Sequence, residues 1–261
     1  MPKLKLPDME LYYTVTGKGV PLLLIHGLGS SSRDWEKQIR PFAKDFQIIT
    51  LDLRGHGQSG KPPGPYSVRM FAEDTATLIH ELGVAPVHMV GISMGGMVAF
   101  ELAVNFPELL RSMVIVNSYP EVRVETLRDR LQIWRRFMIL ELLGMRGTGL
   151  ALSKRLFPYP EQAELRELFV QRWAENDKRA YRNSLRAIVN WDVEEQICEI
   201  RCPVLVVASD QDYMPLEEKK AYAVKIPNAK LVVIKDAHHA VTVERPEQFN
   251  AVLGEFLTQL S

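Results

Sequence analysis

The sequence predicts an α/β fold: a mostly parallel central sheet flanked by helices, with an inserted helical region. Short continuous apolar runs, the kind that a parallel sheet buries on both faces, alternate with stretches of helical spacing. This alternation predicts βαβ units with right-handed crossovers. It stops between residues 120 and 190, where helical spacing continues without an apolar strand. We therefore predict a core formed by residues 1–119 and 191–261 and a helical lid over 120–190.

The composition is that of an ordinary globular chain. Its 261 residues are 46% hydrophobic and 25% charged, which is enough for one large core with an insertion. The formal net charge is zero, so we expect neither nucleic acid nor a membrane surface as a partner. Cys198 and Cys202 lack a metal-ligand pattern and are expected to be inert buried thiols. The sequence therefore predicts no metal site. It has no apolar leader and no long apolar run, which predicts a cytoplasmic protein.

The first elements follow from the apolar pattern. Residues 10–16 alternate apolar and polar side chains, which predicts an edge strand, and the glycines within 17–19 predict a turn. Residues 21–26 form a continuous apolar run and are expected to be a buried strand. A helix over 33–43 has its apolar residues on one face, and 46–51 is the next buried strand.

A second group of elements leads up to the insertion. Ser67 is expected to cap a helix over 68–82, and Gly83 to end it. The elements that follow are, in order, a strand at 87–90, a helix at 97–106 and a strand at 112–116.

Inside the insertion, residues 122–143 and 162–189 have helical spacing. Residues 121–190 contain 14 Lys and Arg against 9 Asp and Glu, an excess of five positive charges. A solvated helical surface explains such an excess without any partner. After the insertion the alternation resumes, with a strand at 203–208, a helix at 216–225, a strand at 230–234 and a helix at 246–257.

Ser93 lies at the corner between an expected strand and an expected helix, within Gly91-Ile92-Ser93-Met94-Gly95. A strand that turns directly into a helix holds its corner residue in strained backbone geometry, and the flanking glycines let the two backbones approach. The hydroxyl would then project from the carboxyl edge of the sheet, beside the free N–H groups of the helix start. This pattern predicts a nucleophilic serine.

A serine hydroxyl needs a positioned base to remove its proton. His238 and His239 follow the last expected strand, at the edge of the sheet where ligand sites of parallel sheets lie. Asp210 and Asp212 leave the same edge after the preceding strand and could orient the base. The residues alone leave both members of each pair open.

These segments resemble the α/β-hydrolase family, and the resemblance covers essentially the whole chain. Residues 91–95 look like its nucleophile elbow, and His26-Gly27-Leu28-Gly29 is similar to its oxyanion-hole loop. The sequence Asp-Leu-Arg-Gly-His-Gly-Gln-Ser at 52–59 matches a loop that many members carry after the next strand.

The resemblance also chooses between the paired acids and histidines. The acid of the family usually stands third after a glycine and shortly before a proline, which selects Asp212, although Ser209 replaces that glycine. The family histidine commonly stands five residues before a glutamate, here Glu244. This selects His239, since His238 occupies the position of the usual glycine.

The resemblance implies acyl transfer by a catalytic triad, the chemistry of a serine esterase (carboxylesterase). Ser93 would attack a carbonyl while His239 takes its proton, and Asp212 would orient the imidazole. The N–H groups of Leu28 and Met94 would form the oxyanion hole. No cofactor and no metal is needed. The histidines of the two other family loops, His26 and His56, are expected to fix turns.

Several related activities stay open. A small-molecule ester is the expected substrate, and the run from Gly91 to Met97 also looks like 3-oxoadipate enol-lactonases and cofactor-free haloperoxidases, which makes a lactone the nearest alternative. Carbon–carbon bond hydrolases of the family often have tryptophan after the histidine, where this chain has Ala240. A ligand receptor that keeps an intact triad is the alternative outside enzymes. The oligomeric state is not predicted.

A further alternative concerns the basic lid. Esterases of this fold that act on methyl esters of acyl-carrier protein dock it through lid arginines, so an acidic carrier protein or an anionic substrate is a possible but less favoured partner. The arginines in question are Arg123, Arg128, Arg130, Arg135, Arg136, Arg179, Arg182 and Arg186.

Overall fold

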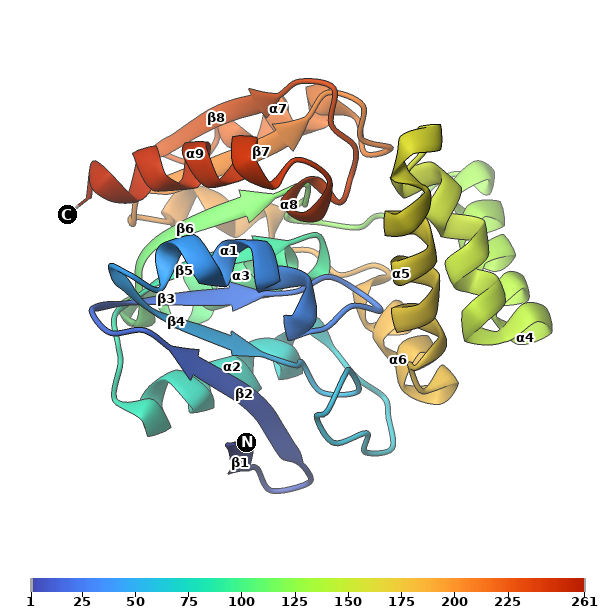
Figure 1. The fold of residues 1–261 in the computed structure, drawn as a ribbon, viewed down its shortest axis with the longest axis horizontal. Helices are drawn as coiled ribbons and strands as arrows, with labels where there is room; N and C mark the ends of the chain where they lie inside the picture. The colour runs from blue at the N-terminus through green and yellow to red at the C-terminus, as the bar shows by residue number, and fades with distance from the viewer. Residues whose placement is uncertain (1, 261) are drawn as a thin grey trace.

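A sheet of eight strands runs through the computed structural model, which describes residues 2–260, in the order β1-β2-β4-β3-β5-β6-β7-β8. The first two junctions, β1 with β2 and β2 with β4, are antiparallel, and all others are parallel. The parallel strands therefore end at one common edge (Figure 1). The strands are β1 (Lys3–Lys5), β2 (Glu10–Thr16), β3 (Val20–Ile25), β4 (Phe46–Leu51), β5 (Val87–Ile92), β6 (Leu110–Val116), β7 (Val204–Ser209) and β8 (Ala229–Ile234).

Helices cover both faces of this sheet. Helices α1 (Glu36–Phe42) and α9 (Pro246–Thr258) lie in front of it in Figure 1, and α2 (Val68–Leu82) and α3 (Met94–Asn105) lie behind it. The core also contains the 3-10 helices η1 (Ser32–Trp35), η2 (Pro107–Leu109) and η4 (Glu194–Glu199) and the helices α7 (Leu216–Ala223) and α8 (Val241–Glu244).

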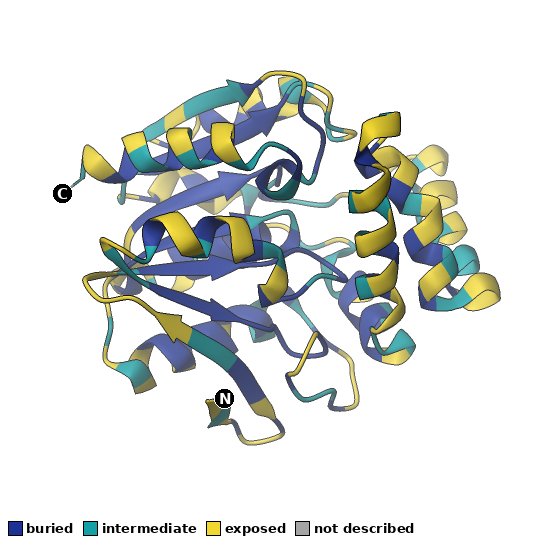
Figure 2. Cartoon of the chain, in the orientation of Figure 1, coloured by how far each residue is buried: buried dark blue, intermediate teal, exposed yellow. Residues whose placement is uncertain are grey.

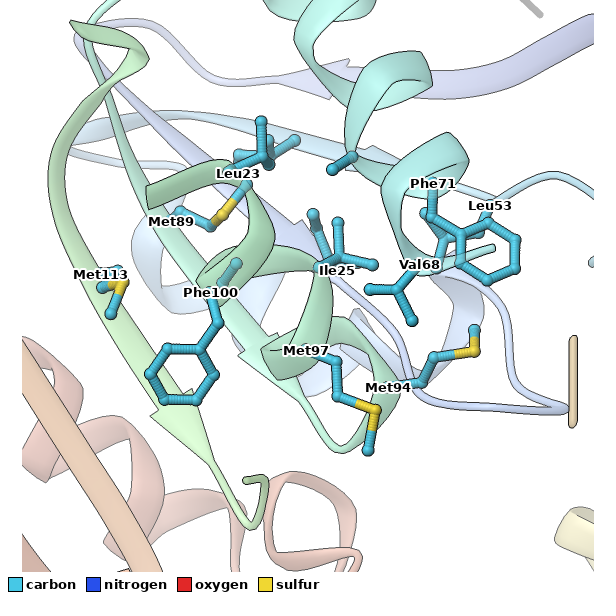
Figure 3. Close-up of a cluster of buried hydrophobic side chains, with 14 of the residues drawn as sticks. Leu23, Ile25, Leu53, Val68, Phe71, Met89, Met94, Met97, Phe100 and Met113 are labelled. Atoms are coloured by element: carbon cyan, nitrogen blue, oxygen red, sulfur yellow. The ribbon is translucent and has the colours of Figure 1, made fainter. Parts of the chain in front are cut away.

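Each face of the sheet has its own apolar cluster. Phe42 and Phe249 from α1 and α9 pack on one face, and Phe71 and Phe100 from α2 and α3 pack on the other. Figure 3 shows part of the second cluster, where strand and helix side chains meet. Full burial of one such side chain stabilises the fold by about 1.5–3 kcal/mol. The continuous apolar runs are thus buried from both sides, as the parallel sheet requires.

The inserted helical region consists of α4 (Leu127–Leu156), α5 (Ala163–Ala174) and α6 (Lys178–Ile188). Helix α4 is interrupted at Gly144, whose φ of 62° and ψ of −166° are not helical. The region lies at the edge where the parallel strands end (Figure 1), and its outer surfaces are exposed (Figure 2). The chain leaves and re-enters the core side by side, because Glu121 and Asp192 form a β-bridge.

The predicted fold class is confirmed, and several details differ. Residues 10–16 form a strand, but the prediction of an edge strand was wrong because β1 pairs with its outer side. The expected helix over 33–43 is divided into η1 and α1. Cys198 was expected to be buried but is exposed, since it lies in a surface 3-10 helix, and Cys202 is half-buried. Among the described residues, no helix combines the length and apolar character needed to cross a bilayer.

Candidate active site

Ser93 forms the corner between β5 and α3 and has a strained backbone. Its φ of 54° and ψ of −118° lie outside the regions that side-chain-bearing residues prefer, a strain of order 1–3 kcal/mol that the surrounding structure must hold. Two hydrogen bonds hold it: the Ser93 N–H donates to Val116 O at 2.9 Å, and Ser118 Oγ donates to Ser93 O at 2.7 Å. The expected strand-to-helix corner is therefore present.

The glycines beside Ser93 allow backbones to cross at this corner. A Cβ on Gly91 would clash with the Gly95 carbonyl oxygen. A Cβ on Gly95 would clash with Ile25 O and lie 2.8 Å from His26 O. Both contacts are with backbone atoms, which cannot rotate away as a flexible side chain can. Glycine is needed at both positions for steric reasons, as the sequence pattern predicts.

Substitution of Gly95 by alanine should therefore destabilise the protein. Forcing an extra methyl group into a packed site costs about 1–3 kcal/mol, which corresponds to a drop in melting temperature of about 2–12 °C for a chain of this size. Thermal unfolding followed by circular dichroism measures it. Gly254→Ala in α9 is the control, because its nearest neighbouring side-chain atom would be 3.9 Å away. Equal melting temperatures for the two variants would contradict the steric argument.

His239 and Asp212 come together after the last two strands. His239 Nδ1 lies 2.9 Å from Asp212 Oδ1, and the Asp212 side chain is fully buried. A carboxylate can only accept here, so Nδ1 carries the proton and Nε2 is left as the basic nitrogen. Burial alone would raise the pKa of Asp212. The charge and hydrogen bond of His239 and the Lys219 ammonium outweigh burial and lower the pKa below its ordinary value.

The other members of the two pairs have different partners. His238 Nδ1 lies 2.8 Å from Glu244 Oε1, and the His238 N–H donates to Glu244 Oε2 at 2.6 Å. Asp210 Oδ1 accepts from the Ala237 N–H at 3.3 Å. These contacts tie neighbouring loops together, so the geometry favours Asp212 and His239 as the acid–base pair.

The loop after β3 passes close to Ser93. A Cβ on Gly27 would lie 3.3 Å from Ser93 Cβ and 3.9 Å from Ser93 Oγ. Leu28 follows in this loop, and Met94 is the first residue of α3, where backbone N–H groups have no partner within the helix. Both residues line the same cavity as Ser93. Leu28 and Met94 thus lie beside Ser93, as an oxyanion hole formed by their N–H groups would require.

A cavity of about 240 Å³ connects these residues. Ser93 and His239 line its floor, with Leu28, Met94 and Met97 around them. The inserted helices cover it with mostly apolar residues, which are Leu152, Leu156, Phe169, Trp173 and Ile188, together with Arg136. Residues 2–260 contain no group of three or more His, Cys, Asp or Glu that could hold a metal ion. The cavity is suited to a small, largely apolar molecule.

Comparison with known proteins agrees with this geometry. The sequence profile of the alpha/beta hydrolase fold family matches residues 20–246. The chain belongs to the α/β-hydrolase family. A putative carbamate hydrolase RutD of Azorhizobium caulinodans is 30% identical to it, with 97% of each chain covered. The 3-oxoadipate enol-lactonase 2 of Acinetobacter baylyi is 28% identical over 93% of this chain and 91% of its own. A thermophilic esterase structure from Thermogutta terrifontis has a TM-score of 0.89 at 26% identity and covers 100% and 99% of the two chains.

The two loop histidines of this α/β-hydrolase, His26 and His56, stabilise loops next to the candidate active site. Leu53 N–H donates to His26 Nε2 at 3.0 Å, so the other ring nitrogen holds the proton and donates to Gly27 O at 2.8 Å. His26 thereby connects the loop after β4 to the loop beside Ser93. The ring of His56 lies 5.1 Å from that of His26, and burial lowers the pKa of His56 to about 3. These contacts agree with the turn-fixing role expected for both.

Sequence reasoning missed one buried group in this hydrolase. Lys219 of α7 is fully buried, and its Nζ contacts Asp212 Oδ2 and donates to Asn117 Oδ1 at 2.8 Å. Asn117, with a φ of 43°, also donates through Nδ2 to His239 O at 3.0 Å and to Ser209 Oγ at 2.8 Å. Burial lowers the pKa of Lys219, and the Asp212 carboxylate opposes this effect. The network fixes the position of the carboxylate that orients His239.

A second contact missed from the sequence involves Tyr213. Its ring lies against the imidazole of His239, with 4.3 Å between the ring centroids and 30° between the planes. Lys219 stands outside the quoted motifs, whereas Tyr213 stands between Asp212 and the proline of the family pattern, at a position to which the pattern assigns no role. The position of Tyr213 directly after Asp212 is the one signal that could have drawn attention to it.

Proposed function

We propose that this hydrolase cleaves carboxylic esters through a Ser93–His239–Asp212 triad and an acyl-enzyme. The observation that carries the proposal is the hydrogen bond between His239 Nδ1 and Asp212 Oδ1, beside a cavity that both His239 and the strained Ser93 line. Nucleophile, base and orienting acid from three strand ends are the components that acyl transfer requires.

The geometry supports the following sequence of steps. His239 Nε2 takes the Ser93 proton as Ser93 Oγ attacks the substrate carbonyl, and Asp212 stabilises the imidazolium that forms. The N–H groups of Leu28 and Met94 hold the negative oxygen of the tetrahedral intermediate. The imidazolium then protonates the leaving alcohol. In the second half, the same base takes a proton from water, which attacks the acyl-enzyme and releases the acid.

The shape of the cavity supports a small substrate. With about 240 Å³ and a mostly apolar roof from the inserted helices, it suits short acyl chains or aromatic alcohols better than long lipids. Residues of these helices line the same cavity as Ser93, and we infer that the helices limit the access of water to it and act as a lid. We propose the division at 119/120 and 190/191 as the boundary between this lid and the catalytic core.

Hydrolysis of p-nitrophenyl acetate and butyrate tests the proposal. We expect steady turnover of both, because p-nitrophenolate is a good leaving group and both acyl chains are short. Release of p-nitrophenolate at 405 nm gives the rate. A single stoichiometric burst without steady turnover would instead favour a ligand receptor that keeps an intact triad.

Lactone hydrolysis is the second candidate, and the observation that favours it is the similarity to 3-oxoadipate enol-lactonase 2 of Acinetobacter baylyi. A lactone is an internal ester, so the same residues would act in the same order, and the alcohol would stay attached to the acyl group. A higher kcat/KM for γ- or δ-lactones than for open esters of equal size would identify this activity. The opposite ranking would support the open ester.

A further inference from the structure

One arginine lines the active-site cavity. Arg136 is half-buried on α4 and lines the cavity that also contains Ser93 and His239. Apart from the histidine, the charged residues among the described lining are Arg136 and Asp34. Asp34 already has a partner, because Arg172 Nη1 donates to its carboxylate at 2.9 Å. Arg136 is therefore the cation available to a bound molecule.

The partner of Arg136 is a neutral hydroxyl. Its Nε and Nη2 donate to Tyr181 Oη at 3.2 and 2.9 Å, and within residues 2–260 no carboxylate lies within ion-pair distance of it. Some arginines of the inserted region do have acids beside them: Arg123 pairs with Asp192 at 3.1 Å, and Arg182 with Glu141 at 3.2 Å. Among residues 2–260, Arg136 is the arginine that both lines this cavity and has no acid beside it.

The geometry leaves hydrogen-bond donors of Arg136 for a ligand. A guanidinium has five N–H groups in a planar fork, and the two bonds to Tyr181 use one edge of it. Tyr181 itself is buried, so these bonds also fix the direction of the side chain. A fork held in this way matches the two oxygens of a carboxylate. A positive charge without a partner in a mostly apolar cavity carries a desolvation cost that a bound carboxylate would offset.

We propose that Arg136 is a substrate-binding residue and that the substrate is an ester or lactone carrying a second, free carboxylate group. This proposal rests on the proposed function and names its substrate class. Arg136 from the roof would bind the free carboxylate, and Ser93 from the floor would attack the ester carbonyl. The remaining apolar lining would contact the carbon chain between the two groups.

Two matched substrate pairs test this assignment. Mono-p-nitrophenyl glutarate and p-nitrophenyl pentanoate share leaving group and chain length and differ in a carboxylate on the acyl side. 4-Acetoxybenzoate and its methyl ester differ in a carboxylate on the alcohol side. In the wild-type protein, we expect the anionic member of at least one pair to have the higher kcat/KM. In Arg136→Gln, the ratio of anionic to neutral kcat/KM should fall about 10- to 100-fold, mainly through KM, the loss typical for a hydrogen bond to a charged group.

Arg135→Gln is the matched control. It removes the same charge from the neighbouring position of α4, where the side chain is exposed and is not part of the cavity lining. The anionic-to-neutral ratio should not change in it. An equal fall of the ratio in both variants would mean that long-range attraction, and not a binding contact, favours the anion. An unchanged ratio in Arg136→Gln, or a wild-type preference for the neutral member of both pairs, would overturn the proposal.

A binding measurement separates this proposal from the proposed function. Calorimetry with monomethyl glutarate on Ser93→Ala and on Ser93→Ala/Arg136→Gln needs no turnover. If no ester is hydrolysed but Ser93→Ala binds the anion in an Arg136-dependent way, the proposed function fails and the carboxylate site stands. If neutral esters are hydrolysed and neither variant binds the anion, the carboxylate site fails and the esterase stands.

Discussion

Ser93→Ala is expected to lower kcat/KM for p-nitrophenyl butyrate by about 10⁴-fold or more. Removing the nucleophile of a serine hydrolase leaves only binding and oxyanion stabilisation, and such losses reach about 10⁶-fold. Ser93 is assigned as the nucleophile because its backbone has the strained conformation of the strand-to-helix corner. Its φ is 54°, and hydrogen bonds to Val116 and Ser118 maintain this conformation. Initial rates at 405 nm, with a spontaneous-hydrolysis blank, measure the effect.

A stability control shows whether such a loss is chemical. Ser67 caps α2, because its hydroxyl accepts a hydrogen bond from the Met70 N–H at 3.1 Å. Ser67 is not among the residues that line the cavity. Ser67→Ala should cost about 1 kcal/mol of unfolding free energy and leave the rate of hydrolysis unchanged. Ser93→Ala should show the reverse, with little change in melting temperature and almost no activity. If Ser93→Ala kept more than a few per cent of the wild-type rate, another residue would be the nucleophile.

The elements whose ends carry clear sequence signals were predictable from the sequence alone. Strand β4 (Phe46–Leu51) and helix α2 (Val68–Leu82) agree with their predicted ranges, because a continuous apolar run and a Ser/Gly pair of caps mark their ends. Strand β1 (Lys3–Lys5) was missed, since its three residues are exposed or half-buried and carry no apolar pattern. Helix α3 begins three residues earlier than expected, directly after Ser93, because local spacing cannot locate a strained corner.

The candidate site likewise contains some residues that the sequence predicts and others that it does not. Ser93 is predicted from its local motif, and resemblance to the local motifs of the family selects Asp212 over Asp210 and His239 over His238. Their assigned roles stay predictions until the variants are measured. Lys219 was not predicted, and Arg136 was named only as one of eight lid arginines that could receive an acidic carrier protein or an anionic substrate. The role of each depends on which distant segment folds beside it. Lys219 is one of several charged residues in α7, yet its side chain is fully buried against Asp212. Arg136 is one of many arginines of the inserted region, and only tertiary structure shows that it lines the cavity.

The dependence of Asp212 on a buried lysine determines how the acid should be tested. Asp212→Asn should lower kcat by about 10⁴-fold, because an amide no longer holds the imidazole in the required tautomer. The same change leaves the Lys219 ammonium buried and unpaired, which costs about 3–5 kcal/mol. Asp212→Asn/Lys219→Met removes that charge. We expect the double variant to regain most of the lost melting temperature and none of the activity, which would separate the catalytic effect of Asp212 from its structural effect.

His239→Ala is expected to lower kcat for p-nitrophenyl butyrate by several orders of magnitude, about as much as Ser93→Ala does, because nucleophile and base act as a unit. His238→Ala is the matched control: it removes the adjacent imidazole, whose Nδ1 contacts Glu244 at 2.8 Å and not Asp212. That variant should lose stability, since a buried carboxylate loses a partner, but less than about tenfold in kcat. If His238→Ala lost more activity than His239→Ala, the hydrogen bond between His239 and Asp212 would have to be structural, and the base would have to be the histidine beside Glu244.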